Sequence, residues 1–304
     1  GLVEHAIREG GRLGVNIGLF NCPGWSQSGG PWVKSGQTMR YVAVSETRVQ
    51  GPAKFERKLP VPKEPFQDIA VLAFPAPRAD AETISAHSPR VRCTPEVAQA
   101  GRLVDGDLET GCPFPAGAPG QKQPFIVDLE LAEAFTARSL ALHPLDGDVY
   151  VRCELQAVDD AGVFRTVRAF TMDRRGPGPD QRVNVGPMLK GPAVVAFAPT
   201  TARHFRLVIT DQQGAGGLAE INLSGAARLD RFVEKELGKM HPTPLPQWDS
   251  YLWAPAQEPD APDLAVALAQ IHNLTGQLEA DGTLRWDVPA GDWIILRSGM
   301  TPTG

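Results

Sequence analysis

The stretch FIVDLEL, residues 125–131, decides the class of the fold, because apolar side chains occupy every second position. Alternation with a period of two places those side chains on one face of a β-strand. The same pattern recurs at Val149–Ala157, and the turn Asp159-Asp160-Ala161-Gly162 then leads into a further strand at Val163–Phe170. Further apolar runs at turn-separated spacing are Asp68–Phe74, Val194–Phe197, Phe205–Ile209 and Leu218–Leu223. Seven or more short strands over roughly 160 residues predict a β-sandwich.

Composition excludes several classes of protein. The 304 residues include 30 Lys+Arg against 35 Asp+Glu, a net charge of −5, so no basic surplus is present to bind nucleic acid. No apolar run approaches the ~20 residues that a membrane-spanning helix needs, so we predict no membrane span. The four cysteines lack paired C-x-x-C spacing, so a zinc site is not predicted, whereas disulfides and free thiols both stay open.

The N-terminal region has a different pattern. Leu2–Arg8 carries apolar residues at helical spacing and is followed by Gly10-Gly11, which we expect to end the helix. Leu13–Leu19 then alternates apolar residues with glycine and asparagine, which predicts a buried strand. A helix, a buried strand and a polar loop are typical of a (β/α) barrel or a doubly wound sheet, where ligands bind at the carboxyl ends of strands.

Shorter elements are expected in the rest of the chain. The turn Gln50-Gly51-Pro52 predicts a hairpin of Tyr41–Val49 and Lys54–Leu59. Towards the C-terminus we expect, in order, a helical stripe at Leu229–Met240, a proline-rich linker at Pro242–Pro262, a hairpin at Leu278–Val288 around Asp281-Gly282, and a strand at Trp293–Ser298.

The loop NCPGWSQSGGPW, residues 21–32, is the strongest candidate binding site. Its tryptophan rings could pack on the C–H faces of a sugar while its hydroxyl and amide groups hydrogen-bond to the sugar hydroxyls. The glycines allow close approach of the backbone. The alternative is that the tryptophans only plug one end of the fold. The candidate sugar-binding residues are Asn21, Trp25, Ser26, Ser28, Gly29, Gly30 and Trp32.

Two motifs at opposite ends of the chain carry a family resemblance. GLFNCPGWSQSGGPW (18–32), followed by MRYVAVSE (39–46), resembles the α-L-rhamnosidases of glycoside hydrolase family 106. VPAGDWIILRSGMTPTG (288–304) is similar to a second motif of that family. The resemblance implies hydrolysis of terminal α-L-rhamnosyl linkages with inversion, aided by calcium. It also implies a rhamnose-containing oligo- or polysaccharide as substrate and an extracytoplasmic location, periplasmic or secreted.

The resemblance also implies how the chain is divided. We predict a multidomain protein, α/β plus all-β, with partial (β/α) barrel elements at both ends and an inserted galactose-binding-like, jelly-roll β-sandwich. Residues 1–64 would be the N-terminal part of a barrel-type catalytic domain, 65–226 the sandwich, and 227–304 a linker and the return to the catalytic domain. The chain begins without methionine and stops directly after an apolar strand, so we expect an internal segment that lacks the remainder of its own chain.

No catalytic residue is assigned. An inverting glycosidase needs a general acid and a general base, both carboxylic acids in most families. The resemblance places them on later barrel strands, beyond Gly304. Glu46, Glu56 and Glu64 lie in strand or linker contexts typical of solvated surface, and Asp249 lies in the proline-rich linker. We therefore expect the segment alone to be inactive. The alternative is a non-catalytic carbohydrate-binding protein that uses the sandwich or the tryptophan loop.

A second resemblance points to a metal. The turn LVDGDLET, residues 103–110, resembles the calcium-binding turn of galactose-binding-like sandwiches, where a glutamate in the last strand helps to hold the ion. Short carboxylates and backbone carbonyls supply the hard oxygens that calcium prefers. The alternative is an ordinary turn, since Asp146-Gly147-Asp148 repeats the pattern. The expected calcium ligands are Asp105, Asp107, Thr110 and Glu220.

Overall fold

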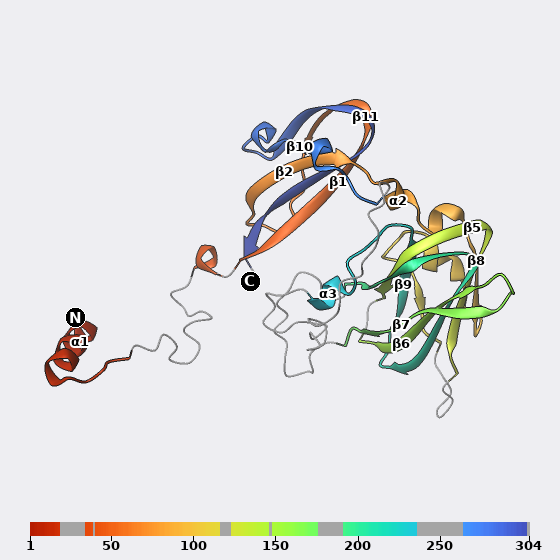
Figure 1. The fold of residues 1–304 in the computed structure, drawn as a ribbon, viewed down its shortest axis with the longest axis horizontal. Helices are drawn as coiled ribbons and strands as arrows, with labels where there is room; N and C mark the ends of the chain where they lie inside the picture. Colours follow the sequence, from red (N-terminus) through yellow and green to blue (C-terminus); the bar gives the residue numbers. More distant parts are fainter. Residues whose placement is uncertain are drawn as a thin grey trace.

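The structure is a computed structural model that describes residues 1–18, 34–38, 40–115, 123–145, 148–175, 191–235 and 264–302. Antiparallel strands dominate these ranges and form a four-stranded and a seven-stranded sheet (Figure 1). Within the same ranges, no helix has the length and apolar character needed to cross a membrane. The helices are α1 (Leu2–Leu13), α2 (Arg78–Ala81) and α3 (Phe232–Lys235), with 3₁₀ turns at η2 (Ser35–Gln37), η3 (Ser85–His87), η4 (Ala100–Val104), η6 (Leu268–Gln270) and η7 (Thr275–Gln277).

The strands follow in chain order. They are β1 (Arg40–Lys58), β2 (Gln67–Pro75), β3 (Arg90–Thr94), β4 (Cys112–Pro113), β5 (Phe125–Pro144), β6 (Tyr150–Val158), β7 (Phe164–Asp173), β8 (Ala193–Gln213), β9 (Gly217–Ser224), β10 (His272–Asn273) and β11 (Thr283–Pro302).

The four-stranded sheet joins the two ends of the chain in the order β1-β11-β2-β10. Strand β1 pairs with β11 along its length, from Arg40 opposite Pro302 to Lys58 opposite Thr283. The predicted hairpin at residues 41–59 is therefore wrong. Gly51 lies at a register shift where the strand continues without reversing, and a Cβ there would come within 1.8 Å of the Pro289 backbone oxygen. Glycine is needed for this close approach and does not mark a turn.

A small core covers one face of this sheet. The turn at Asp281-Gly282 forms as predicted, with Gly282 N–H donating to the Glu279 carbonyl at 2.9 Å and φ of 87° at Gly282. Trp293–Ser298 is not a separate strand but the middle of β11. The small core of the four-stranded sheet consists of the buried side chains of Phe55, Leu59, Val71, Ala73, Leu274, Leu284, Val288, Trp293 and Ile295.

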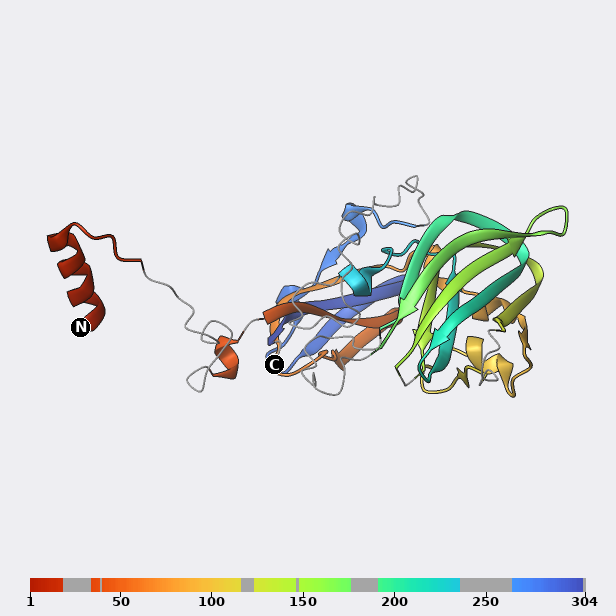
Figure 2. The same cartoon turned by 90° about the horizontal axis from the view of Figure 1, so that it is seen from below.

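The seven-stranded sheet forms the predicted β-sandwich (Figure 2). Strands β5 and β8 pair with each other through two register shifts, and these long strands run through both layers. The first half of β5 pairs with β3, and the second half pairs with β9. One continuous core fills the space between the layers, with Phe205 and Leu207 fully buried at its centre. The alternating positions of residues 125–131 supply one wall of that core, as the sequence indicates.

The structure places one strand differently from the predicted domain boundary. Asp68–Phe74, expected to begin the sandwich, lies in β2 and pairs with β11 in the four-stranded sheet. The chain enters and leaves the sandwich side by side, because Thr83 bridges Ser224 and Ile84 N–H donates to the Leu223 carbonyl at 2.8 Å. The sandwich is therefore inserted between β2 and β10.

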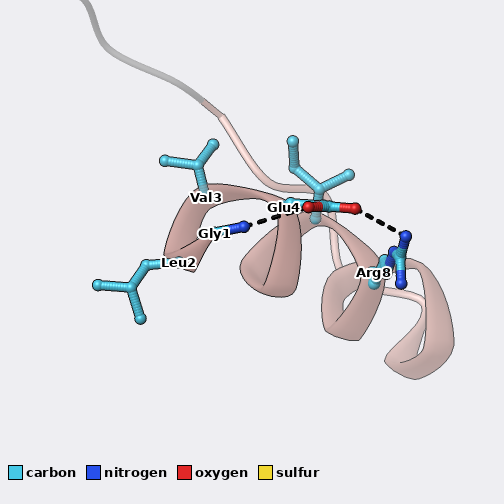
Figure 3. A pocket seen from close by; sticks show the side chains of 6 residues that line it. Gly1, Leu2, Val3, Glu4 and Arg8 are labelled. Carbon is cyan, nitrogen blue, oxygen red and sulfur yellow. Dashed lines mark hydrogen bonds and ion pairs between the residues drawn. The ribbon is translucent and has the colours of Figure 1, made fainter.

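The N-terminal prediction is partly wrong. Helix α1 runs through Gly10-Gly11 and ends at Gly14, whose φ of 69° makes it the left-handed cap. The expected strand after it is not found among the described residues: Val15 and Ile17 are 55% and 44% exposed. The helix lies apart from both sheets (Figure 1) and exposes Leu2 and Val3 (Figure 3). Ile7 is also exposed. No β/α unit therefore forms in the part of the chain that the structure describes.

The second predicted helix is short. Helix α3 covers only Phe232–Lys235 of the stripe expected at residues 229–240, and the positions after 235 lie outside the described residues. The proline-rich linker at 242–262 also lies outside them.

Candidate functional site

The tryptophan loop, residues 21–32, lies outside the described residues, so all seven sugar-binding candidates in it stay predictions. The second family motif is described as far as Pro302, at the end of β11. There Thr301 is fully buried, and its hydroxyl oxygen has no hydrogen-bond partner among the described residues. Lys63 Nζ donates to the Pro302 carbonyl at 3.2 Å, which holds the end of this motif against the segment before β2.

The predicted calcium turn is ordered by its own side chains. It follows η4, and Asp105 Oδ1 accepts a hydrogen bond from Asp107 N–H at 2.9 Å. Asp107 Oδ1 in turn accepts one from Glu109 N–H at 2.9 Å. These are Asx turns, in which a short carboxylate replaces a backbone acceptor. Gly106 adopts φ of 79°, and its N–H donates to Glu220 Oε2 at 3.2 Å. The glycine is needed here because the left-handed backbone turns this N–H towards β9.

Three of the four predicted ligands meet at this turn. Thr110 Oγ1 donates to Asp105 Oδ2 at 3.1 Å and also contacts the Asp107 carbonyl oxygen at 3.3 Å. Glu220, from β9, is only 4% exposed and reaches the turn through Gly106. Asp107 meets the others through its backbone: its carbonyl oxygen faces Thr110, while its carboxylate accepts a hydrogen bond from the Glu109 N–H. The turn and the last strand of the sandwich therefore come together across more than a hundred residues of sequence.

Burial shifts a titratable group at the same place. Burial and, to a lesser extent, the neighbouring Asp105 carboxylate together raise the pKa of Glu220 to about 7, against the hydrogen bonds from the backbone of Gly106 and Asp105. His143 lies opposite Glu220 in the β5–β9 pairing. Burial, followed by the charge of Arg228, lowers the pKa of His143, so it does not become a countercharge at neutral pH.

The donor atoms fit calcium better than a transition metal. No group of three or more His, Cys, Asp and Glu side chains suited to a metal occurs in the described ranges. The groups at this turn are the carboxylates of Asp105 and Glu220, the Thr110 hydroxyl and the Asp107 carbonyl. Each of them would offer a metal an oxygen ligand. Calcium takes six to eight such oxygens, whereas zinc sites use mainly nitrogen and sulfur. The residues present would supply part of a calcium shell.

Raising the pH is expected to destabilise the metal-free chain through Glu220. The unfolded carboxyl loses its proton near pH 4.5, whereas the folded one keeps it to about pH 7. The associated stability is complete below pH 4.5 and is lost as the pH rises through 7, an effect on the order of 2 kcal/mol. Urea unfolding in chelator at pH 5 and pH 7.5 measures it, with Glu220→Gln as the comparison. An equal loss in parent and variant would contradict this assignment.

The second motif contains a buried arginine that the sequence did not predict. Arg297 in β11 is 6% exposed; its Nε and Nη2 donate to the two carboxylate oxygens of Asp68 at 2.6 and 2.9 Å, and its Nη1 donates to the Leu59 carbonyl at 2.8 Å. The ion pair with Asp68 holds β11 against β2. Only its position within the apolar strand Trp293–Ser298 could have indicated that it is buried.

The acidic residues near the first motif are surface groups, as expected. Glu46, Glu56 and Glu64 are all exposed, and Glu56 pairs with Arg285 at 2.9 Å. Cys93, Cys112 and Cys153 are free thiols, which answers for these three the question left open by their spacing. Burial raises the pKa of the Cys93 thiol to about 12, so it is not a reactive nucleophile.

Comparison with known proteins places the chain in context. The rhamnosidase from Novosphingobium sp. PP1Y matches its structure with a TM-score of 0.59 at 24% identity, over 98% of this chain and 27% of that one. A putative β-glucuronidase of Formosa agariphila is 41% identical over 80 residues, which are 25% of this chain and 7% of that protein. A Clostridium perfringens family 32 carbohydrate-binding module, solved with GalNAc-β-1,3-galactose, matches 46% of this chain and 98% of its own at 19% identity and a TM-score of 0.36.

The match covers nearly all of this chain but only about a quarter of the Novosphingobium rhamnosidase. The model of one family, glycoside hydrolase family 106, described as α-L-rhamnosidase, matches residues 1–304. With every residue from Gly1 to Gly304 matched, the chain belongs to this family.

Proposed function

We propose that the chain is a segment of an enzyme that hydrolyses terminal α-L-rhamnosyl linkages in oligo- or polysaccharides with inversion. The observation that carries the proposal is the match of the α-L-rhamnosidase family to the whole chain. The catalytic acid and base are proposed to lie outside this segment, in the remainder of a (β/α) barrel. A substrate of this size would be met outside the cytoplasm, in the periplasm or the surrounding medium.

The described carboxylates support this division of labour. An inverting enzyme places its two carboxyl groups ~6.5–9.5 Å apart, one of them with a raised pKa. Glu220 has a raised pKa, but it is held by the calcium turn within the sandwich. The acidic residues near the first motif are exposed. On this proposal the segment contributes substrate-binding surface and structure, and the catalytic carboxylates come from the rest of the enzyme.

The experiment compares the 304-residue chain with the longer product of its reading frame on an aryl α-L-rhamnoside. We expect the longer protein to hydrolyse the rhamnoside and the 304-residue chain not to. Nuclear magnetic resonance of the first sugar released should show the inverted anomer. Turnover by the chain alone would contradict the placement of the catalytic pair. No turnover by the longer protein would overturn the enzymatic proposal in favour of a carbohydrate-binding protein.

In the longer enzyme, Trp25→Ala is expected to weaken substrate binding by about 1–3 kcal/mol, because the proposed sugar site loses one aromatic surface. Steady-state kinetics should show the loss in KM or kcat/KM, while circular dichroism shows an unchanged folded fraction. Unfolding without a separable kinetic effect would identify Trp25 as a structural plug. Trp32→Ala is the parallel variant at the other end of the loop.

Calcium is proposed as a structural ion of the sandwich. Asp105, Thr110 and Glu220 would hold it through side-chain oxygens, together with the Asp107 carbonyl. An ion there would offset the repulsion between the two carboxylates and tie the turn to β9. Its role would be to hold the end of the sandwich in place.

A further inference from the structure

The sandwich carries a cavity of about 450 Å³ that none of the predicted site residues lines. It is lined by residues of β6, β7 and β8, together with Arg231 from the segment before α3. Within β6, Cys153 and Leu155 are buried in the core, so the alternate residues Arg152 and Glu154 face away from it. The cavity therefore lies over the outer face of three adjacent strands.

The strand pairing sets out the polar groups in two rows. Arg152 lies opposite Thr171 on β7 and Thr210 on β8. Two residues along β6, Glu154 lies opposite Ala169 and Val208 in the same way. One row is thus hydroxyl–guanidinium–hydroxyl, and the next is methyl–carboxylate–isopropyl. Cross-strand neighbours lie ~4.5–5.5 Å apart, so both rows fit beneath a single small molecule.

Neighbouring groups hold these side chains in place. Glu154 Oε1 accepts hydrogen bonds from Gln156 and Thr166, which lower the pKa of Glu154 and keep it ionised. Arg152 Nε lies 3.3 Å from Asp211 Oδ2. Arg231 also lines the cavity and is 8% exposed. It has φ of 53°, and its N–H donates to the Val194 carbonyl at 2.8 Å. A non-glycine residue in this conformation is kept there only when its surroundings require it.

The geometry points to a second, non-catalytic glycan-binding site, in which one neutral sugar unit lies over β6, β7 and β8. The Glu154 carboxylate would accept hydrogen bonds from adjacent sugar hydroxyls, and Arg152, Thr171 and Thr210 would donate to ring or hydroxyl oxygens. Ala169 and Val208 offer apolar surface to the C–H groups of the sugar. A volume of about 450 Å³ lies within the range of small-molecule sites. That the glycan contains rhamnose rests on the proposed function.

The test is affinity electrophoresis of the 304-residue chain in gels that contain rhamnogalacturonan, with dextran gels as the reference polysaccharide. The parent is expected to be retarded by rhamnogalacturonan only. Glu154→Gln and Arg152→Met should each raise the apparent Kd at least tenfold, and Thr210→Val, an exposed substitution, should raise it severalfold. Arg165→Met is the matched control, because Arg165 pairs with Asp159 at the β6–β7 turn and does not line the cavity.

Each result decides the proposal. Retardation that all three cavity variants retain at the parental level, or a parent that no rhamnogalacturonan gel retards, would overturn it. Equal retardation in dextran would overturn the rhamnose-containing ligand. Thermal melting of each variant identifies any that fails to fold, and Thr210→Val then carries the comparison. Binding is measured on the 304-residue chain and does not depend on hydrolysis. The binding result therefore stands even if the longer protein fails to hydrolyse the rhamnoside.

Discussion

Asp68→Ala is expected to lower the free energy of unfolding by about 2–4 kcal/mol, more than Arg297→Met does. The Arg297 side chain is 7% exposed and depends on Asp68 for its ion pair, so removal of Asp68 leaves a buried charge without its counterion. The Asp68 side chain is 36% exposed, so water can solvate it when Arg297 is replaced. Methionine has a similar length and suits the apolar surroundings of β11, and we expect a cost of about 1 kcal/mol.

Urea unfolding of the parent, Asp68→Ala, Arg297→Met and the double variant measures this asymmetry. The double variant should resemble Arg297→Met, because no buried charge remains. Equal destabilisation by the two single variants would show that the pair behaves as a solvated surface salt bridge. Arg285→Met is the matched control on β11, because Arg285 and its partner Glu56 are both exposed.

Calcium at a hundredfold excess over its Kd is expected to stabilise the sandwich by about 2.7 kcal/mol, because an ion that binds only the folded state adds RT ln(1 + [L]/Kd). The physical cause is the proximity of the buried Glu220 carboxylate to Asp105, which the cation would neutralise. The measurement is thermal melting of the chain in calcium and in chelator, read on the transition of the sandwich.

Variants at the turn assign the effect to particular residues. Asp105→Ala and Glu220→Gln should abolish the response to calcium. Glu109→Gln should keep it, because Glu109 is exposed and joins the turn only through its backbone N–H. Equal melting of the parent in calcium and chelator, or an Asp105→Ala variant that still responds, would remove calcium from the proposed structure.

Sequence predicts the sandwich well because one face of each strand is buried, and burial imposes the period of two on residues such as Val127 and Leu129. It predicts the four-stranded sheet poorly because the partner of β1 lies more than two hundred positions away. Without that partner, Gly51-Pro52 has the appearance of a turn. The low helix propensity of Gly10-Gly11 predicted the wrong end for the first helix. The helix continues through both glycines to its cap at Gly14.

The candidate metal site divides in the same way. The turn at Asp105 has a local signal, since Asx turns and a glycine with positive φ both depend on neighbouring residues. The distant candidate ligand Glu220 follows only from the resemblance to galactose-binding-like sandwiches, because no local pattern links it to the turn. That the Asp107 carboxylate accepts the Glu109 N–H, while its carbonyl oxygen faces Thr110, has no signal in the sequence.

The side-by-side ends of the sandwich have a consequence for the order of folding. Closing the loop from Lys58 to Thr283 brings together residues 225 positions apart, and 141 of those positions lie between Thr83 and Ser224. Once the sandwich has folded, its bridged ends act as a short link, and the loop-closure entropy falls by (3/2)RT ln(225/84), about 0.9 kcal/mol. The sheet that unites the two ends of the chain therefore forms fastest after the inserted unit. Damage to the sandwich core would slow the assembly of a sheet whose own buried side chains form a separate cluster.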